Sequence, residues 1–360
     1  MVVLLRSTDG NPDSRFEKYV NFLSSEGIAF LTCCWDRNGV KQDTPRQMFY
    51  HGSAKYGEGM KNIWKLFKFN IFLLRTLCKR RSEYEVIHAA DLDTVLPAVC
   101  MKLLFGKRVI YDIYDWYIDS RCVKNKFAVG IIKLLERISI KISDVVIICE
   151  PERERQIIYK PKKLWILPNI PNIDSGVSFK SADNPVLTIS YVGVLGYERG
   201  LEKLIRYAKE HTCIRLEIAG FGPLEHLLED AGYSNIRYHG TVKYEDGLKI
   251  MGSSDLIYAV YEKTNPNHIL AAPNKYYEGL FLGKPIITTE GTIVGEKTSE
   301  YKTGFCIEED YQDLQRLLEN ISPEMISEYS ANASSLWKKN YSTYTQSFLK
   351  GNYLPYIISA

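Results

Sequence analysis

The segment from Ala272 to Thr288, APNKYYEGLFLGKPIIT, combines residue types that could hold a nucleoside diphosphate. It predicts a turn, a two-turn helix over Lys275–Phe281, and then a buried β-branched strand. A helix that starts from a loop offers free N–H groups and a positive dipole end to a phosphate, beside Asn274 and Lys275. Glu278, one turn further on, can accept hydrogen bonds from both hydroxyls of a ribose. The alternative is an ordinary strand–loop–helix unit whose glutamate is solvated.

Carboxylates and a histidine at predicted strand ends are the next candidates for chemistry. Asp112 and Asp115 close a strand in YDIYDWY, where they would contact acceptor or donor-sugar hydroxyls in a catalytic role. The alternative is that they cap the helix that follows. His88 and Asp91 in HAAD line a cleft or, alternatively, begin the next helix.

Two further candidates lie elsewhere in the chain. His268 is either a catalytic contact to the donor sugar or an ordinary loop histidine. Arg15, in the first predicted helix, is a further candidate that could reach the cleft. No cysteine or histidine spacing matches a zinc site, so the sequence predicts no metal. The strand-following GxGxxG of NAD enzymes and the GxxxxGK[ST] of P-loop ATPases are both absent, which disfavours those two classes.

A long basic segment, KNIWKLFKFNIFLLRTLCKRR, predicts an amphipathic helix. At 100° per residue, its cations fall in one stripe with an aromatic residue on either side, and its aliphatic residues face away toward the sheet. Such a stripe suits the surface of an anionic bilayer, and the alternative is a solvated lysine face. The predicted membrane contacts are Lys61, Lys65, Lys68, Phe69 and Phe72.

Length and composition describe an ordinary two-domain protein. The 360 residues suit two α/β domains, and no stretch reaches the roughly 18 uncharged apolar residues of a spanning helix. The initial MVVLL is too short for a signal peptide and reads as the first buried strand. Eight cysteines without a CxxC pair indicate reduced thiols, and so a cytoplasmic protein. Together with the basic helix, this predicts peripheral attachment to the inner face of the membrane.

Charge is divided unevenly along the chain. Residues 1–170 hold 28 Lys and Arg against 19 Asp and Glu, whereas residues 171–360 hold 18 against 24. The basic half would face an anionic partner, which could be a membrane surface, a phospholipid-like acceptor or nucleic acid. Nucleic acid is disfavoured because no aromatic and basic sheet motif is present.

Alternating strand and helix patterns predict doubly wound parallel sheets. A segment with four prolines, residues 160–185, separates two such series and predicts an acceptor domain over 1–170 and a donor domain over 171–334. We expect the helical tail, 335–360, to pack back on the first domain. The predicted strands are Val2–Leu5, Ala29–Cys34, Val86–His88, Arg108–Asp112, Val145–Ile148, Leu187–Val192, Arg215–Ala219, Ile236–His239, Leu256–Val260 and Pro285–Thr288. The predicted helices are Arg15–Ser25, Asn62–Arg80, Thr94–Phe105, Phe127–Ile142, Leu201–His211, Leu224–Ala231, Tyr244–Met251, Lys275–Phe281 and Tyr311–Asn320.

Several blocks in order resemble the retaining nucleotide-sugar glycosyltransferases of family 4, which have the GT-B fold. In the second half these are SYVGVLGYERGLEKLI, LEIAGFGPLEHLL, YHGTVKYEDGLKIMGSSDLIYAVY and APNKYYEGLFLGKPII. In the first half, EVIHAADLDTVLPA and KRVIYDIYDWYIDS are similar to the family's His-bearing and Asp-rich strand ends. The resemblance implies two Rossmann-like domains that face each other across a cleft.

The resemblance also implies roles for individual residues. Glu278 matches the second Glu of the family's Glu-x7-Glu motif, which holds the donor ribose. Arg199 stands at a donor-phosphate contact, and Gly193 lies in the loop that the diphosphate approaches. Gly240 and Thr241 lie where backbone groups contact the base. The leaving diphosphate takes up the acceptor proton in one route proposed for the family, and no metal cofactor is expected.

Two positions depart from the family pattern. Leu270 replaces the first Glu of Glu-x7-Glu, so the loop before Asn274 would contact the sugar through Asn267, His268 or backbone N–H groups. Val194 stands where the family often has an arginine, which removes one phosphate contact. Both departures concern the identity of the donor sugar.

We therefore expect a retaining glycosyltransferase that moves a sugar from a nucleotide-diphosphate donor, with UDP-sugars favoured, to a glycan or lipid-linked acceptor. The resemblance implies a setting in surface polysaccharide assembly. One alternative is a GT-B nucleotide-sugar 2-epimerase, which would act on the donor without an acceptor. Another is a catalytically silent scaffold that binds nucleotide sugars.

Overall fold

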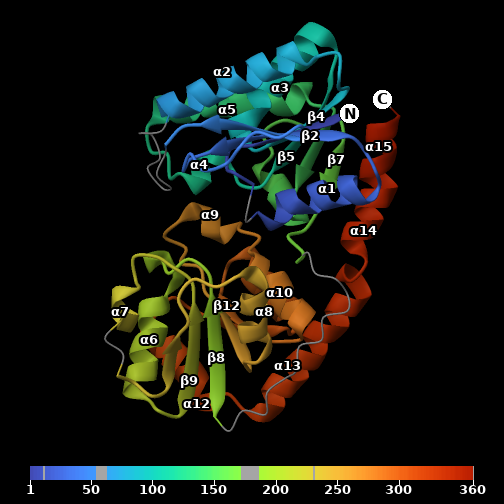
Figure 1. The fold of residues 1–360 in the computed structure, drawn as a ribbon. Helices are drawn as coiled ribbons and strands as arrows, with labels where there is room; N and C mark the ends of the chain where they lie inside the picture. The colour runs from blue at the N-terminus through green and yellow to red at the C-terminus, as the bar shows by residue number, and fades with distance from the viewer. Residues whose placement is uncertain (11–12, 54–62, 172–185, 230–231, 360) are drawn as a thin grey trace. The chain divides into compact units, whose positions relative to one another are not determined.

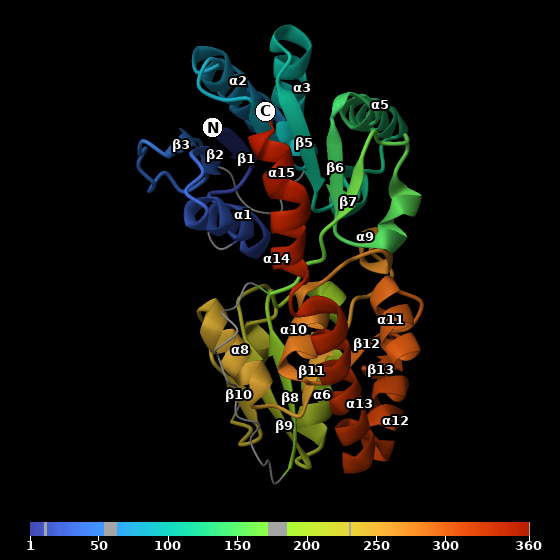
Figure 2. The same cartoon turned by 90° about the vertical axis from the view of Figure 1, so that its right-hand side faces the viewer.

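The chain divides into two compact units, each built around its own parallel sheet (Figures 1 and 2). The structure, a computed structural model, describes residues 1–10, 13–53, 63–171, 186–229 and 232–359. Unit 1 comprises Met1–Pro168 with Thr345–Ala360, and unit 2 comprises Asn169–Tyr344. The sequence placed the boundary after residue 170 and assigned the tail from residue 335 onward to the first domain. Among the described residues, no helix has both the length and the apolar character needed to cross a bilayer.

Unit 1 holds a seven-stranded sheet in the order β3-β2-β1-β4-β5-β6-β7, with every neighbouring pair parallel. The strand order reverses direction beside β1, as in a doubly wound fold, so the loops there meet at the carboxyl ends of β1 and β4. The strands are β1 Val2–Arg6, β2 Phe30–Asp36, β3 Gln47–His51, β4 Val86–Ala90, β5 Arg108–Ile113, β6 Val145–Ile148 and β7 Leu164–Ile166.

Strand alternation gives the unit 1 sheet two different faces. On one face Val3, Ile87 and Tyr111 belong to the main hydrophobic core, which helices α2, α3 and α5 cover. On the other face His88 and Asp112 lie against α1 and the end of the chain. The helices of unit 1 are α1 Ser14–Ser25, α2 Ile63–Lys79, α3 Leu92–Phe105, α4 Tyr117–Ser120 and α5 Lys126–Ile142, with a 3-10 helix η2 at Pro151–Gln156.

Unit 2 repeats the arrangement with six parallel strands in the order β10-β9-β8-β11-β12-β13. Its strands are β8 Leu187–Val192, β9 Ile214–Ala219, β10 Ile236–Tyr238, β11 Leu256–Ala259, β12 Ile286–Thr289 and β13 Gly304–Ile307. Its helices are α6 Leu201–Glu210, α7 His226–Glu229, α8 Tyr244–Gly252, α9 Pro266–Ile269, α10 Asn274–Leu282, α11 Ile293–Tyr301, α12 Tyr311–Asn320 and α13 Pro323–Leu336, with a 3-10 turn η3 at Tyr197–Arg199.

The end of the chain passes from one unit to the other as a nearly continuous helix. A π-helical turn η4 (Trp337–Tyr341) follows α13, and α14 (Tyr344–Phe348), a second π-helical turn η5 (Leu349–Tyr353) and α15 (Leu354–Ile358) complete it. Leu336 belongs to a core of unit 2, whereas Phe348 packs edge-on against Trp165 of unit 1, with ring centroids 5.6 Å apart. The tail therefore contributes apolar side chains to both cores.

The sequence did not predict β3, β7, β13 and α11, for different physical reasons. The first two are edge strands of five and three residues with little apolar alternation. β13 begins at Gly304, and a glycine weakens the prediction of a strand. The structure requires glycine there, because a Cβ would lie 2.2 Å from the carbonyl oxygen of Ile286. The helix α11 has a mixed composition, and its start is fixed by Thr292, whose hydroxyl accepts the Gly295 N–H at 3.0 Å.

Candidate active site

The carboxyl ends of β8 and β9 meet backbone to backbone in unit 2. Gly193 donates its N–H to the carbonyl of Ala219, and Gly220 donates to the carbonyl of Gly240 at 2.8 Å. A Cβ on Gly220 would lie 1.8 Å from the carbonyl oxygen of Gly193, and all three glycines have positive φ. Only glycine fits such a close approach of two backbones. Because Gly193 has no side chain, a phosphate group of a ligand can come close to the loop after β8.

Lys275 directs its ammonium group at this loop from the first turn of α10. Its Nζ lies 2.8 Å from the position of a Cβ on Gly193 and 4.6 Å from the ring centroid of Tyr191. Burial, with Glu278 opposing it and the nearby Arg199 charge adding to it, lowers the pKa of Lys275 to about 8. The N-cap residue of α10, Pro273, makes no side-chain capping bond. The ammonium of a residue in the first turn of α10 therefore faces Gly193.

Glu278 lies one turn after Lys275 on the same helix, and it is buried, with 5% of its surface exposed. Burial raises its pKa, although the Lys275 charge and a hydrogen bond from Tyr244 oppose that shift. A buried carboxylate three residues from a half-buried ammonium suits a polar ligand that bonds to both groups. Asn274, at the start of this helix, is exposed.

Arg199 completes the cationic side of this site. It ends the η3 turn after β8, and its guanidinium stacks over the ring of Tyr261 at 4.5 Å. In the part of the chain that the structure describes, its Nη1 is buried without a hydrogen-bond partner. A buried, unsatisfied guanidinium N–H is costly unless an acceptor such as a phosphate oxygen joins it.

The loop that would contact the donor sugar is held by its own hydrogen bonds. His268 donates from Nδ1 to the carbonyl of Glu262 at 2.9 Å, and its Nε2 lies 3.8 Å from the Glu198 carboxylate. Burial lowers the pKa of His268, which favours a neutral ring with its Nε2 lone pair available. Asn267 donates its N–H to the side chain of Asn265 at 3.1 Å. His268 and Asn267 thus lie in the short helix α9, which follows β11 and Tyr261 in the chain.

The two residues assigned to the base lie farther along the sheet edge. Gly240 follows β10 with a φ of 66°, and its carbonyl holds the β9 loop through Gly220. Thr241 is exposed beside it. The structure thus brings Gly193, Arg199, Lys275 and Glu278 together, and it places Gly240 and Thr241 on a neighbouring strand end.

In unit 1, Asp112 is the centre of a buried network rather than part of an open site. It accepts hydrogen bonds from Arg15 at 2.7 Å, from the Tyr19 hydroxyl at 2.8 Å and from His88 at 3.4 Å. His88 in turn shares a 3.0 Å hydrogen bond with the Tyr353 hydroxyl of the tail. These side chains are at most 5% exposed. This burial favours a structural role for Asp112, Arg15 and His88, and their assignment to catalysis or to substrate contact stays a prediction.

The electrostatics of this network fit a structural role. Burial alone would raise the pKa of Asp112, but the Arg15 charge and the hydrogen bonds from His88 and Arg15 outweigh it and lower the pKa to about 2. Asp112 is therefore a full charge at neutral pH, and Arg15 neutralises it within the same unit.

Asp91 and Asp115 lie nearer the surface, at the carboxyl ends of β4 and β5. Asp91 has a φ of 65°, a strained backbone for a residue other than glycine, and it accepts the N–H groups of Tyr114 and Asp115. It also forms an ion pair with Arg6, which in turn bonds Asp13 at 2.7 Å. Burial raises the pKa of Asp91 to about 6 despite the Arg6 charge. The sequence analysis missed Arg6, whose signal is its place at the carboxyl end of the first strand.

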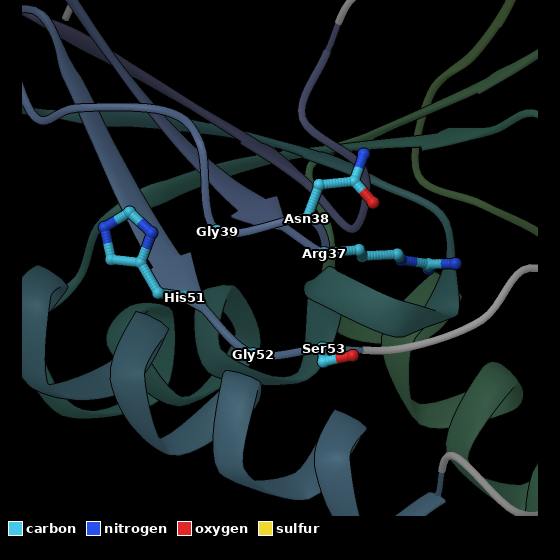
Figure 3. A pocket seen from close by; sticks show the side chains of 6 residues that line it. All are labelled: Arg37, Asn38, Gly39, His51, Gly52 and Ser53. Carbon is cyan, nitrogen blue, oxygen red and sulfur yellow. The ribbon is translucent and has the colours of Figure 1, made fainter.

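A hollow at the other end of this sheet edge was also missed (Figure 3). It is lined by Arg37, Asn38 and Gly39, which follow β2, and by the end of β3 and the residues after it, His51, Gly52 and Ser53. Below it, the buried Asp36 holds the loop by accepting three backbone N–H groups, and it lies 3.2 Å from Nδ1 of His51. The Arg37 guanidinium donates to the Ser7 carbonyl at 2.9 Å. The hollow therefore presents an imidazole and a guanidinium on opposite sides.

The structure changes which residues of α2 can form the predicted membrane stripe. Phe69 is fully buried and stacks on Trp35 at 5.2 Å, because it points into the core, so it cannot edge an exposed stripe. Phe72 is half-buried against the same core. Lys68 is exposed and Lys65 is half-exposed. Lys61 lies outside the described residues.

Comparison with solved structures gives the fold of the whole chain. Neither a protein-family model nor a curated protein sequence matches it. Sucrose-phosphate synthase (tll1590) from Thermosynechococcus elongatus is similar with a TM-score of 0.74 and 14% identity, covering 100% of this chain and 99% of that one. Alr3699/HepE from Anabaena, solved with UDP and glucose, is similar with a TM-score of 0.67, 11% identity and coverage of 98% and 99%. WaaG, a glycosyltransferase involved in lipopolysaccharide biosynthesis, is similar with a TM-score of 0.65, 13% identity and coverage of 95% and 96%. The chain therefore has the two-domain α/β GT-B fold, as predicted.

Proposed function

We propose that this chain is a retaining glycosyltransferase whose nucleotide-sugar donor binds in unit 2. The observation that carries the proposal is the Lys275 ammonium, which points at the side-chain-free Gly193 loop from the start of α10. We assign Glu278, one turn later on α10, to the donor ribose, and Arg199, whose Nη1 is unsatisfied, to the diphosphate. HepE, which has a similar fold, has been solved with UDP and with UDP-glucose, which favours a UDP-sugar here.

The chemistry follows from charge that grows on the leaving diphosphate. As the bond between the anomeric carbon and the diphosphate oxygen breaks, Lys275, Arg199 and the start of α10 stabilise the developing negative charge, so no metal ion is required. The acceptor hydroxyl forms its new bond on the same face of the sugar and passes its proton to the leaving phosphate oxygen. Configuration is retained, and no protein side chain needs to act as the base.

Acceptor contacts in the proposal come from unit 1. Asp91 and Asp115 lie at strand ends, where substrates of parallel sheets bind, and Asp115 is about half exposed. In unit 2, His268 and Asn267 would contact the donor sugar in place of the missing glutamate at Leu270. We propose a glycan or lipid-linked acceptor, with peripheral attachment to an anionic membrane surface, as in surface polysaccharide assembly.

Turnover with a panel of donors tests this proposal. Purified protein is incubated with UDP-, GDP- and dTDP-sugars, with and without a lipid and glycan extract, and release of nucleoside diphosphate is measured. We expect release that requires the extract and that falls at least tenfold in Arg199→Ala and Lys275→Met. Donor turnover without any acceptor would instead identify an epimerase. Tight donor binding without release under any condition would identify a silent scaffold.

A further inference from the structure

The helix layer on one face of unit 1 exposes an unusual amount of apolar surface. Helix α3 packs between α2 and α5 on this face (Figures 1 and 2). Of the 22 large apolar side chains exposed in the described part of the chain, ten belong to these three helices. They are Ile63, Trp64, Phe67, Leu103, Leu104, Phe105, Phe127, Ile131, Leu134 and Ile138. Apolar surface gathered in this way indicates a contact with something outside the chain.

Helix α5 carries the most regular part of this surface. Phe127, Ile131, Leu134 and Ile138 recur at intervals of four, three and four residues, which places them in one stripe. Phe127 is 79% exposed and Leu134 is 56% exposed. A parallel stripe of cations lies beside the apolar one. It consists of the exposed residues Lys126, Lys133, Arg137 and Lys141.

Helix α2 presents the same pair of stripes. Ile63, Trp64 and Phe67 are each more than half exposed, and the rings of Trp64 and Phe67 stack at 5.3 Å. The exposed cations Lys68, Arg75 and Lys79 lie along the adjacent side of the helix. The aromatic residues beside the basic stripe are therefore Trp64 and Phe67, rather than the buried Phe69.

The three helices expose no carboxylate over their described lengths. Helix α2 contains no acidic residue, α3 contains only Asp93 and α5 contains only Glu136. Asp93 is 4% exposed and bonds Ser7 and Arg121, and Glu136 is 1% exposed. Burial raises the pKa of Glu136 to about 7, so this group is only partly charged at neutral pH. The face is thus apolar and cationic, with nothing to repel an anionic surface.

We propose that the α2–α3–α5 face, defined as the exposed side chains of these helices, docks the protein on an anionic lipid bilayer. The stripe of α5 and the Trp64–Phe67 pair lie at the depth of the lipid headgroups, and the adjacent cations contact anionic headgroups. A protein partner fits less well, because the centres of protein interfaces are depleted of lysine whereas these cations run the length of both apolar stripes. This inference deepens the proposed function. It rests on that function in one respect: a lipid-linked acceptor would give the enzyme a reason to bind a membrane.

The full chain carries its own probe for this contact. Trp64 is 64% exposed, whereas Trp35, Trp116 and Trp165 are buried and Trp337 is half-buried. Tryptophan emission and co-sedimentation are measured with vesicles of phosphatidylcholine alone and with 30 mol% phosphatidylglycerol, without donor or acceptor. We expect binding to the anionic vesicles with a blue shift of the emission. The Trp64→Phe variant should bind equally well and lose most of the shift.

Two double variants and their controls test which residues carry the contact. Phe127→Glu with Leu134→Glu should reduce binding at least tenfold, while Met325→Glu with Ile358→Glu, exposed apolar positions elsewhere, should not. Lys133→Glu with Arg137→Glu should also reduce binding at least tenfold, since each cation removed is worth about fivefold. The matched charge control is Lys338→Glu with Lys339→Glu, two exposed lysines of η4.

Each outcome decides the inference independently of catalysis. Unchanged vesicle binding in both α5 variants, or no binding by the parent protein, overturns it. Self-association that the α5 variants abolish, without vesicle binding, would assign the face to a second copy and also overturns it. A thermal shift measured with UDP reports nucleotide binding and so checks that the variants are folded. It also separates failure of this inference from failure of the proposed donor site.

Discussion

At the scale of single residues, the proposed donor site depends on the contact between Lys275 and the Gly193 loop. The ammonium is half-buried beside Gly193, a residue without a Cβ. Arg199 lies close enough to lower the pKa of Lys275. The two cations repel each other until an anion lies between them. The site is therefore organised for a dianionic group before any ligand arrives, which reduces reorganisation in the transition state.

Lys275 gives the donor site a pH dependence whose sign can be stated. An anion needs the charged ammonium, so UDP affinity should fall as pH rises through about 8, the pKa of the unliganded group. Lys275→Arg should remove this dependence, and Lys275→Met should lower affinity about 10- to 100-fold at pH 7. Without ligand, the unfolded chain holds more protons than the folded one between pH 8 and 10.5, so stability should rise with pH there. Calorimetric titrations from pH 6.5 to 9.5 measure the affinity, and an unchanged affinity over that range would argue against this geometry.

Gly220 tests the backbone contact itself. Gly220→Ala places a Cβ against the Gly193 carbonyl, where only the backbone can move away, and its φ of 137° disfavours any side chain. We expect a loss of about 1–3 kcal/mol in the free energy of unfolding together with weakened UDP binding. Gly130→Ala is the matched control, because its Cβ would meet nothing within 4 Å in the helix α5. That control should gain about 0.5–1 kcal/mol, and equal effects in the two variants would contradict the contact. Urea unfolding measures both variants.

At the scale of elements, the Asp112 network joins parts of unit 1 that are distant in the chain. Arg15 and Tyr19 come from α1, His88 from β4, and Tyr353 from the π-helical turn of the tail. All of them converge on the face of the sheet opposite α2, α3 and α5. The tail is thus held to unit 1 by polar bonds as well as by the apolar contact between Phe348 and Trp165.

The two aspartates of YDIYDWY should behave oppositely when neutralised. Asp112→Asn removes the charge that pairs with the buried Arg15 and should cost about 3–5 kcal/mol of folding stability. Asp115→Asn, at an exposed position on the same strand end, should change stability by less than about 0.5 kcal/mol and affect turnover instead. Thermal and urea unfolding with steady-state kinetics distinguish the two effects. A stable Asp112→Asn protein with reduced turnover would restore the catalytic assignment.

The pH dependence of stability provides a second measure of the network. The folded pKa of Asp112, about 2, lies below its ordinary value of 3.8, so this group stabilises the fold above pH 4. That contribution should be lost as pH falls from about 4 to 2, and Asp112→Asn should remove this part of the acid transition. Burial raises the pKa of Asp91 to about 6, which acts in the opposite sense by relieving a cost as pH falls below 6.

At the scale of the whole molecule, local sequence pattern predicted most of the architecture and less of the site. Buried parallel strands read as long apolar runs, so β6 and β8 were placed at the residues where the structure has them. The edge strands β3 and β7 lack that signal because only one side of each is paired.

The site divides in the same way. Lys275 and Glu278 are three residues apart in one helix, so their proximity follows from helix geometry. The burial of Asp112 could not be foreseen, because Arg15 lies 97 residues before it and Tyr353 joins the network from the far end of the chain. Local pattern contains no information on such contacts, so the sequence predicted a substrate contact for this strand-end aspartate without indicating its buried partners.

The most direct measurement is calorimetric titration of the full chain with UDP, GDP, dTDP and ADP, repeated on Lys275→Met and Glu278→Gln. The account predicts that one nucleoside diphosphate binds, with UDP favoured, that Lys275→Met weakens it by about 10- to 100-fold, and that Glu278→Gln weakens it less. Binding that neither variant changes, or no binding by any nucleoside diphosphate, would contradict the donor site on which the proposed function rests.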